Sequence, residues 1–480
     1  MNNQRLFFIL IAVCTAIGLG NLWLYPYFSF KYTGLIFIPY FIAILLVGIP
    51  VLILELSIGQ YFDKNVVDIF YSVRKWFSSI GWLISFNAFI VMCYFAVMLS
   101  WNIIYFFASF GTQWKNNASH YFFNNVLQAS GNLSGFGGLS LPVFIALLIS
   151  WLLIFVYVGK GYKSIKRSFF VTSMVLAVLL IFFLFYSLLL GNALNGIYAF
   201  IKPDFGALFN PEVWLASFSM ALLSLGASFG IMTALGTKMK KGLVVGNSFA
   251  ISTFELVISV AMGFIMFSIL GFLSLKNGVA VEALVSSNYS STFTVLANAF
   301  PLLPKSSVIS LLFFVFLILF FILGTSSLAY AISHVLVHKF NTKHINVSIL
   351  VCGLGFLGGL VFATKPGIYL MDIVSHFSSY NILLVILLEC IAIGWFFDSE
   401  KMASFINSNS KIKIGVVWRF LIRFIVPLVV IFFIILQLKS DLMSSYNNYP
   451  LWVLLSFGLG TVAIPIVAAF LMPEKIFDRR

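Results

Sequence analysis

Long apolar runs, separated by short polar loops, dominate the chain. Most of these runs reach the roughly 20 residues that an α-helix needs to cross a hydrocarbon core of about 30 Å. They lack the two-residue alternation of a transmembrane β-barrel, so the pattern predicts an all-α integral membrane protein. The predicted helices cover twelve segments, at about 6–29, 35–61, 80–108, 139–158, 167–190, 211–236, 243–273, 305–337, 346–362, 370–397, 415–437 and 448–472.

Two of the predicted helices contain small and polar residues near their middle. These clusters run from Ala16 to Asn21 in helix 1 and from Ser224 to Gly230 in helix 6. Glycine destabilises a helix by about 1 kcal/mol per residue, and unwound backbone at membrane depth is tolerated only where it lines protein or a water-filled cavity. Close helix packing through small residues would explain either cluster alone. Two clusters five helices apart favour an inverted-repeat transporter with its site at the midplane.

This symmetry predicts a single transmembrane transporter domain over residues 1–480, with helices 1 and 6 broken. The first inverted repeat holds helices 1–5 within residues 6–200, and the second holds helices 6–10 within residues 211–397. Helices 11 and 12 are appended in residues 415–472.

Composition agrees with lipid as the solvent, because 61% of the residues are hydrophobic and 9% are charged. The net charge of +14 does not indicate nucleic-acid binding, since the basic residues are spread over short loops and form no patch with aromatic neighbours. Most of them, including Lys160, Lys163 and Lys166, fall on one side of the predicted membrane, which places both termini in the cytoplasm. The expected location is the cell membrane, and the expected partners are lipid and a small-molecule substrate. The sequence leaves a homodimer open.

No arrangement of residues in the sequence suggests an enzyme: we find no Ser/His/Asp or Cys/His constellation and no phosphate-cradling loop. His334 and His338 have a spacing that permits a metal, but without a nearby cysteine or acid a solvated helix end is the better interpretation. Three carboxylates, Glu55, Glu255 and Glu389, lie deep in apolar runs. Acids inside a membrane span are functional candidates by default.

Several blocks of the sequence resemble the neurotransmitter:sodium symporter family, over about residues 5–472. They are Ala16 to Tyr27, Ile38 to Phe41, Gly48 to Gln60, Trp214 to Gly230, Gly324 to Ser327, Gly367 to Asp372 and Trp418 to Pro427. The resemblance implies sodium-coupled symport of a small organic solute, with a neutral amino acid as the favoured substrate, by alternating access around a midplane site. The alternatives are a transporter-like sensor or uncoupled channel that retains the fold, and a symporter of an amine or osmolyte that lacks the standard carboxylate contact.

The resemblance also implies one or two sodium ions. Sodium is a hard cation that takes several oxygen ligands, which the carbonyls of a broken helix and nearby hydroxyls supply. The first site maps to Ala16, Asn21, Ser224 and Glu255, and the second maps to Cys14, Ile17, Ile322, Thr325 and Ser326. The substrate site maps to Ala16, Leu19, Gly20, Val91, Phe95, Ser224, Gly226, Phe229, Ser326 and Tyr330. For the hydroxyls of Thr325 and Ser326, a bond back to the preceding helical turn is the alternative.

Glu55 and Glu255 receive roles from the same resemblance. Glu55 matches a glutamate that caps free backbone amides of the unwound segments. Glu255 falls where chloride-dependent relatives carry Asn, and Ser259 lies one turn later at a family chloride-ligand position. A fixed carboxylate there would supply the charge that chloride supplies elsewhere, so chloride is not expected to be required. A protonated Glu255 hydrogen-bonded between helices is the alternative.

The sequence also departs from the family pattern. Phe95 takes the place of the tyrosine whose hydroxyl binds the substrate carboxylate, and Tyr330 either supplies a substitute hydroxyl or only fills space. Leu24 and Ser375 replace both members of the outer charged gate, which leaves no buried charge unpaired. At the inner gate, the sequence begins after the family's Arg-x-x-Trp segment, and Phe340 replaces its aspartate partner. We therefore expect apolar gates on both sides.

Overall fold

A computed structural model describes residues 3–20, 36–115, 117–130, 138–202, 205–240, 242–284 and 291–472. These residues form helices and loops without a named β-strand, in agreement with the predicted all-α class. The main helices are α1 (Asn3–Gly20), α3 (Phe37–Ala43), α4 (Ile49–Phe62), α5 (Val66–Val73), α6 (Ser78–Ala108), α8 (Leu141–Val158), α9 (Tyr162–Leu188), α10 (Ala193–Ile201), α11 (Pro211–Ser224), α12 (Ile231–Gly236), α13 (Val244–Asn277), α16 (Ser306–Phe340), α17 (His344–Leu360), α18 (Gly367–Ile391), α19 (Ser399–Asn409), α20 (Val416–Phe420), α21 (Val426–Met443) and α23 (Gly460–Leu471). The shorter helices are α7 (Ala118–His120), α14 (Val281–Leu284), α15 (Ser291–Thr294) and α22 (Leu451–Val453).

Several of these helices join into longer stretches through π-helical turns. Ile44–Gly48 connects α3 to α4, Leu421–Ile425 connects α20 to α21, and Leu454–Leu459 connects α22 to α23. Among the described residues, nine helical stretches are long and apolar enough to cross a membrane. Three other predicted segments correspond to α1, to α11 with α12, and to α17. The count of twelve spans and the inverted symmetry remain predictions.

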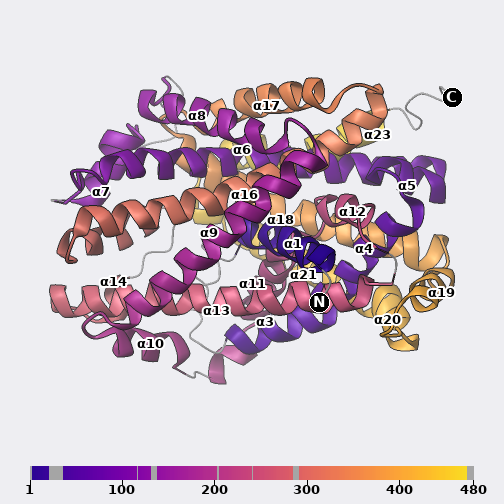
Figure 1. Ribbon diagram of the computed structural model, residues 1–480, viewed down its shortest axis with the longest axis horizontal. Coiled ribbons are helices and arrows are strands. Elements are labelled where there is room, and N and C mark those ends of the chain that lie inside the picture. The colour runs from indigo at the N-terminus through magenta and orange to yellow at the C-terminus, as the bar shows by residue number, and fades with distance from the viewer. Residues whose placement is uncertain are drawn as a thin grey trace.

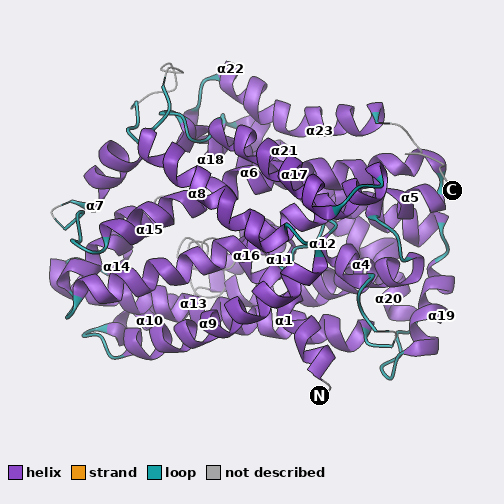
Figure 2. Cartoon of the chain, turned by 45° about the horizontal axis from the view of Figure 1, so that its top comes forward, coloured by secondary structure: helices purple, strands orange, loops and turns teal. Residues whose placement is uncertain are grey.

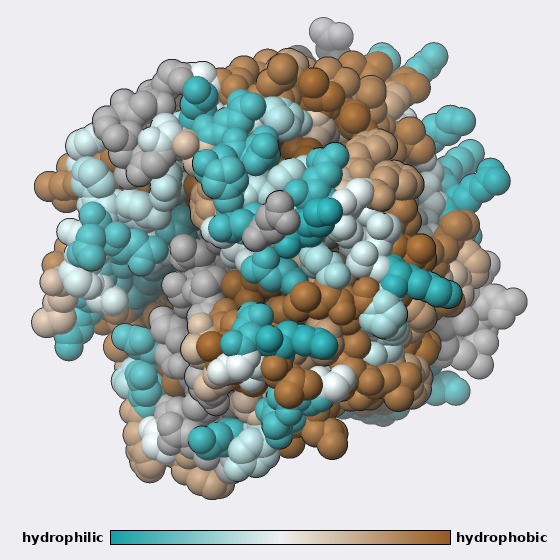
Figure 3. Space-filling model, turned by 90° about the vertical axis from the view of Figure 1, so that its left-hand side faces the viewer, coloured by the Kyte–Doolittle hydropathy of each residue, from teal (hydrophilic) through white to brown (hydrophobic). Residues whose placement is uncertain are grey.

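The long helices lie side by side in one bundle, with α6, α13 and α16 running along its length (Figure 1). α1 is near the middle of this view and packs against α9, α11, α13 and α16. Most loops gather at the two ends of the helices (Figure 2). On the end that carries α7, α10 and α14, hydrophilic side chains cover much of the face and hydrophobic side chains lie toward its edges (Figure 3). This distribution suits a bundle whose sides meet lipid and whose ends meet water.

Candidate functional site

Helix 6 is interrupted where the sequence predicts a break. α11 ends at Ser224 and α12 begins at Ile231. Between them, Gly226, Ser228 and Gly230 have φ angles of 66°, 70° and 70°, a left-handed conformation that glycine adopts freely and serine rarely. The break leaves backbone N–H and C=O groups at the two helix ends without helical partners.

The break predicted in helix 1 from Ala16 to Asn21 is not seen among the described residues of that segment. α1 is helical through Gly20, and the predicted residues Asn21 and Leu24 lie outside the described part of the chain. Only the backbone is described for Ala16, Ile17, Leu19 and Gly20. Their assignment to the sodium and substrate sites stays a prediction.

Glu55 of α4 reaches the break in helix 6. Its Oε1 accepts a hydrogen bond of 2.7 Å from the backbone N–H of Ser228, and the Glu55 side chain is fully buried. A carboxylate is a strong acceptor for a backbone donor that has lost its helical partner. The contact has the geometry of the predicted capping role. Glu389 of α18, also fully buried, lies beside Glu55.

Ser224, Glu255 and Ser259 meet around a fourth residue, Tyr40 of α3. The Tyr40 hydroxyl donates to Glu255 Oε1 and lies 3.0 Å from Ser224 Oγ. Ser259 Oγ donates to the same Glu255 oxygen across 3.0 Å. All four side chains are fully buried. This Glu255 cluster, made of Tyr40, Ser224, Glu255 and Ser259, joins α3 and α13 to the end of α11 beside the break.

The hydrogen bonds of the Glu255 cluster run toward the carboxylate. Two hydroxyls donate to one oxygen of Glu255, which suits an ionised carboxylate and equally the carbonyl oxygen of a protonated one. Each hydroxyl oxygen keeps lone pairs after donating its proton. The cluster can therefore offer a hard cation one charged oxygen and several neutral ones.

Sequence analysis did not assign Tyr40 to any site. Tyr40 lies in the Ile38 to Phe41 block of the family resemblance, which was the available signal. A tyrosine in an apolar run also suits a membrane interface or a helix contact. Only the fold shows that its hydroxyl stands between Ser224 and Glu255.

The second group of predicted sodium ligands lies on α16. Thr325 Oγ1 donates to the Phe321 carbonyl across 2.8 Å. This is the bond to the preceding helical turn that was the alternative to sodium binding. Ser326 Oγ is buried and has no hydrogen-bond partner in the part of the chain that the structure describes. Both hydroxyls are compatible with cation binding, since each oxygen has lone pairs that a cation can use.

The same part of α16 faces α1. Ser327 Oγ donates to Thr15 Oγ1 of α1 across 3.0 Å. The remaining described residues of the second site, Cys14 on α1 and Ile322 on α16, are both buried. The structure thus places the described members of this site on two helices that touch.

The other residues predicted to contact substrate lie on α6, on α16 and in the break of helix 6. Val91 and Phe95 are buried on α6, and the Phe95 ring centroid lies 5.8 Å from that of Phe321 on α16. Tyr330 is buried one turn beyond Ser326. Gly226 and Phe229 belong to the break between α11 and α12. No hydrogen bond among the described residues joins these side chains into one cluster.

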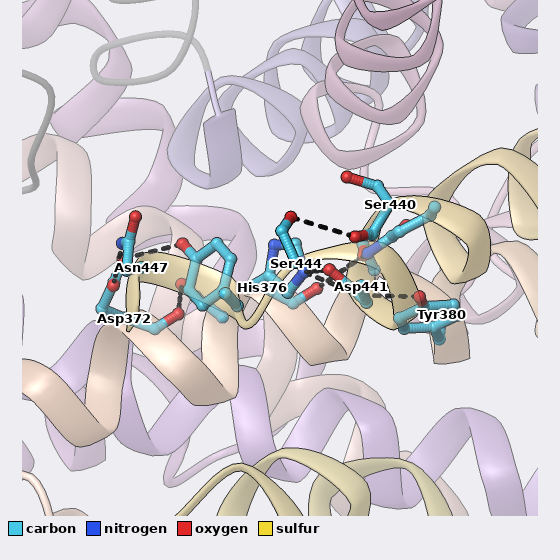
Figure 4. Close-up of polar contacts among 11 residues, drawn as sticks. Asp372, His376, Tyr380, Ser440, Asp441, Ser444 and Asn447 are labelled. Carbon is cyan, nitrogen blue, oxygen red and sulfur yellow. Dashed lines mark hydrogen bonds and ion pairs between the residues drawn. The ribbon is translucent and has the colours of Figure 1, made fainter. Parts of the chain in front are cut away.

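A second carboxylate arrangement, which sequence analysis missed, lies between α18 and the residues that follow α21 (Figure 4). Asp372 accepts hydrogen bonds from Tyr446 Oη at 3.1 Å, Asn447 Nδ2 at 2.9 Å and Tyr449 Oη at 3.0 Å. Burial and the neighbouring Asp372 carboxylate raise the pKa of Tyr449, so its hydroxyl remains a donor at neutral pH. The Asp372 carboxylate has three fixed donors.

The same arrangement continues one turn further along α18. His376 Nε2 lies 2.9 Å from Asp441 Oδ1, and the Tyr380 hydroxyl donates to Asp441 Oδ2 across 2.7 Å. Ser375, predicted to replace the outer-gate aspartate, donates to the Asp372 carbonyl across 2.9 Å. We call the set Asp372, His376, Tyr380, Asp441, Tyr446, Asn447 and Tyr449 the outer network.

Comparison with known proteins identifies several related chains. The model of the sodium:neurotransmitter symporter family matches residues 1–120 and 112–476. An uncharacterized sodium-dependent transporter of Methanocaldococcus jannaschii is 31% identical over 98% of this chain and 97% of its own length. A sodium- and chloride-dependent GABA transporter of Drosophila melanogaster is 26% identical over 95% of this chain and 53% of its own. The human sodium- and chloride-dependent creatine transporter 1 is 27% identical over 94% of this chain and 79% of its own.

Proposed function

Since this chain belongs to the sodium:neurotransmitter symporter family, we propose that it carries a small neutral amino acid across the membrane together with one or two sodium ions. Members of the family are sodium-dependent transporters, and this multi-pass membrane protein is a transporter and not an enzyme. The proposal concerns the substrate, the ions and the residues that bind them.

The observation that carries the proposal is a buried carboxylate beside a broken helix. A charged oxygen is costly to bury unless a cation or hydrogen-bond donors compensate it, and Glu255 is fully buried with hydroxyl groups around it. Ser224 connects this cluster to the last turn of α11, where the carbonyls of Leu222 and Leu223 accept hydrogen bonds from the backbone of the break. A carbonyl oxygen has a second lone pair that a cation can use. A sodium ion at this place would be held by Glu255, Ser224, carbonyls of the broken helices and the amide of Asn21.

A second sodium ion would bind between α1 and α16. Ser326 and Thr325 would provide hydroxyl oxygens, and Cys14, Ile17 and Ile322 would provide backbone carbonyls. The Ser326 hydroxyl, which has no hydrogen-bond partner among the described residues, supports this site, because binding a cation would satisfy its buried oxygen.

Chloride would not be required. The relatives that act on GABA and creatine are named as chloride-dependent, whereas this chain has the Glu255 carboxylate within a cluster of hydroxyl donors. If that carboxylate were absent, Tyr40, Ser224 and Ser259 would be suitable donors to chloride, because a hydroxyl group can donate to a chloride ion as well as to a carboxylate. Glu255 would fill this role with a charge that is part of the protein.

The substrate would occupy the space between α6, α16 and the break in helix 6. Relatives named for GABA, creatine and taurine support a small organic solute. Phe95 offers no hydroxyl to a substrate carboxylate, so that group would depend on sodium and on backbone N–H groups. An amine or osmolyte without a carboxylate is the competing substrate class.

The test is uptake into proteoliposomes containing the full-length protein. Radiolabelled neutral amino acids, amines and osmolytes are supplied under an inward sodium gradient, a potassium gradient of equal size, and a sodium gradient without chloride. We expect uptake of a neutral amino acid that needs sodium and persists without chloride. Binding of that solute without any uptake would favour a sensor, and sodium currents without a solute would favour an uncoupled channel.

A further inference from the structure

The first described turns of α1 are tied to α13 by one polar contact. Arg5 Nε donates to Asn247 Oδ1 across 3.0 Å. Asn247 is fully buried in the first turn of α13, and its Nδ2 lies 3.3 Å from Met239 Sδ. The ion pairs among the described residues are His376 with Asp441 and Arg419 with Glu400. Arg5 therefore rests on a neutral amide and not on a carboxylate.

Gly246 makes room for this contact. A Cβ atom at Gly246 would lie 2.9 Å from a terminal nitrogen of the Arg5 guanidinium and 4.0 Å from Ile412 Cδ1. The absence of a side chain at Gly246 thus allows the guanidinium to lie against the start of α13. The Arg5 guanidinium therefore fits against the surface of α13 at Gly246.

The elements that receive Arg5 are firmly joined to one another. A Cβ at Gly236 of α12 would lie 2.5 Å from the Leu56 carbonyl oxygen of α4, so these two backbones are in direct contact. Gln60 Nε2 of α4 donates to the Met239 carbonyl across 3.2 Å, and Met239 also contacts Asn247. α4, α12 and the start of α13 form one block, to which α1 is attached through side chains.

A second polar contact holds α1 closer to the predicted ion sites. Thr15 accepts the hydrogen bond from Ser327 of α16 and lies ten residues after Arg5, which is about 15 Å along the helix. Release of Arg5 would free the cytoplasmic turns of α1, and the neutral hydrogen bond at Thr15, which contributes about 1 kcal/mol, would be too weak to keep the neighbouring Cys14 in place. Phe340, expected to take part in an apolar inner gate, is 48% exposed and so provides little closing contact.

From these contacts we propose that Arg5 and Asn247 form a latch that keeps the cytoplasmic end of α1 closed against α13. The inference rests on the proposed function, because a latch of this kind matters in a transporter that opens to each side in turn. A guanidinium bound to a neutral amide is held more weakly than one bound to a carboxylate. The latch is strong enough to favour the closed state and weak enough to open in each cycle.

The native Cys14 can report on this latch. Its thiol is buried on α1 against the Ser173 hydroxyl of α9, so it becomes accessible when α1 moves away. The other cysteines, Cys93, Cys352 and Cys390, are buried on other helices. A water-soluble maleimide is applied to the purified full-length protein in sodium-free buffer, and mass spectrometry identifies each labelled cysteine.

Three single variants should change the rate of Cys14 labelling, two by raising it and one by lowering it. Arg5→Ala and Asn247→Ala should each label Cys14 about tenfold faster than wild type, because each removes a hydrogen bond to a charged group. Asn247→Asp offers Arg5 a carboxylate and should label Cys14 more slowly than wild type. In the double variant Arg5→Ala with Asn247→Ala, Cys14 should be labelled no faster than in either single variant. Both substitutions remove the same hydrogen bond, so their effects should not add.

Gly246→Ala is a milder second test, since the added methyl group would displace the guanidinium without removing either partner. It should raise the rate of Cys14 labelling by a smaller factor than Asn247→Ala. Unchanged labelling in Asn247→Ala, or labelling of Asn247→Asp as fast as that of Asn247→Ala, would overturn the latch. So would equal labelling of Cys93 and Cys14, which indicates general unfolding. These measurements need no substrate, so a failure of the proposed transport activity would appear separately in the uptake assay.

Discussion

The Glu255 cluster and the outer network both centre on carboxylates, but they satisfy those carboxylates in different ways. Asp372 has three donors from two phenols and an amide, and Asp441 has an imidazole and a phenol. Glu255 has small hydroxyls and one phenol around it and lies beside a broken helix. A carboxylate surrounded by fixed N–H and phenol donors has little capacity left for a ligand, whereas hydroxyl oxygens can turn toward a cation.

The two arrangements also connect different parts of the fold. The outer network fastens α18 to the residues at the end of α21 and beyond it (Figure 4). The Glu255 cluster connects α3, α13 and the broken helix, where left-handed residues replace regular helical turns. We therefore assign a structural role to the first and an ion-binding role to the second. The following predictions test that difference.

The largest effect is expected for Glu255→Gln, which keeps the shape of the side chain and removes its charge. Sodium affinity in chloride-free buffer should fall about 100-fold, equivalent to about 2.8 kcal/mol. Added chloride should restore part of the affinity, with Ser259 and Tyr40 as donors to the anion. Sodium-dependent uptake in proteoliposomes measures both results. A wild-type protein that already needs chloride, or a variant that behaves as wild type without it, would favour a protonated structural Glu255.

A smaller effect is expected for the second site. Ser326→Ala should lower sodium affinity about tenfold, because it removes an oxygen ligand of the cation. Thr325→Ala should act in the same direction. Ser333→Ala is the matched control. Ser333 also lies on α16, and its buried hydroxyl has no hydrogen-bond partner among the described residues. Titration of uptake with sodium distinguishes them, and equal effects of Ser326→Ala and Ser333→Ala would remove the case for a site at Ser326.

Tyr40→Phe should have a more modest effect of about fivefold on sodium affinity, equivalent to about 1 kcal/mol for one hydrogen bond. The phenyl ring preserves the packing of α3, while the hydroxyl between Ser224 and Glu255 is lost. The same titration with sodium measures the change. If Tyr40→Phe lowers thermal stability and leaves sodium affinity unchanged, the hydroxyl serves the fold alone.

The smallest effect on transport is expected in the outer network. Asp441→Asn should lower the free energy of unfolding by about 1–2 kcal/mol, because His376 and Tyr380 lose a charged acceptor. Sodium affinity should remain close to that of wild type. Thermal unfolding measures the change in stability, and titration of the same preparation with sodium measures the affinity. A loss of sodium affinity comparable to that of Tyr40→Phe would contradict the structural assignment.

The sequence predicted the features that follow from local chemistry. Glycines in an apolar run identified the break between Ser224 and Ile231, because each of them weakens a helix in the same way wherever it occurs. The deep carboxylates Glu55 and Glu255 were likewise visible as charges in apolar segments. Their roles needed the family resemblance, and the structure then placed Glu55 at the break and Glu255 beside Ser224.

Features that depend on distant contacts could not be predicted in this way. The members of the outer network come from α18, from the end of α21 and from the residues after it. No local pattern links Asp372 with Asn447, which lies 75 residues later. α10 lies in a segment interpreted as a loop, and it packs on α13 through Gly196, where a Cβ would lie 1.8 Å from the Phe267 carbonyl oxygen. Such close backbone contacts are set by the partner helix and leave little signal in the segment itself.

The end of α11 beside the Glu255 cluster also gives the site an electrostatic direction. The aligned peptide dipoles of a helix place about half a negative charge at its C-terminal end, and α11 has 14 residues that end at Ser224. This partial charge and the Glu255 carboxylate act on the same side, so both attract positive groups and repel negative ones. A zwitterionic solute would be turned in this field, with its ammonium group toward the end of α11 and its carboxylate toward the sodium ion that offsets the Glu255 charge. The broken helix would therefore set the orientation of the solute before any side chain touches it.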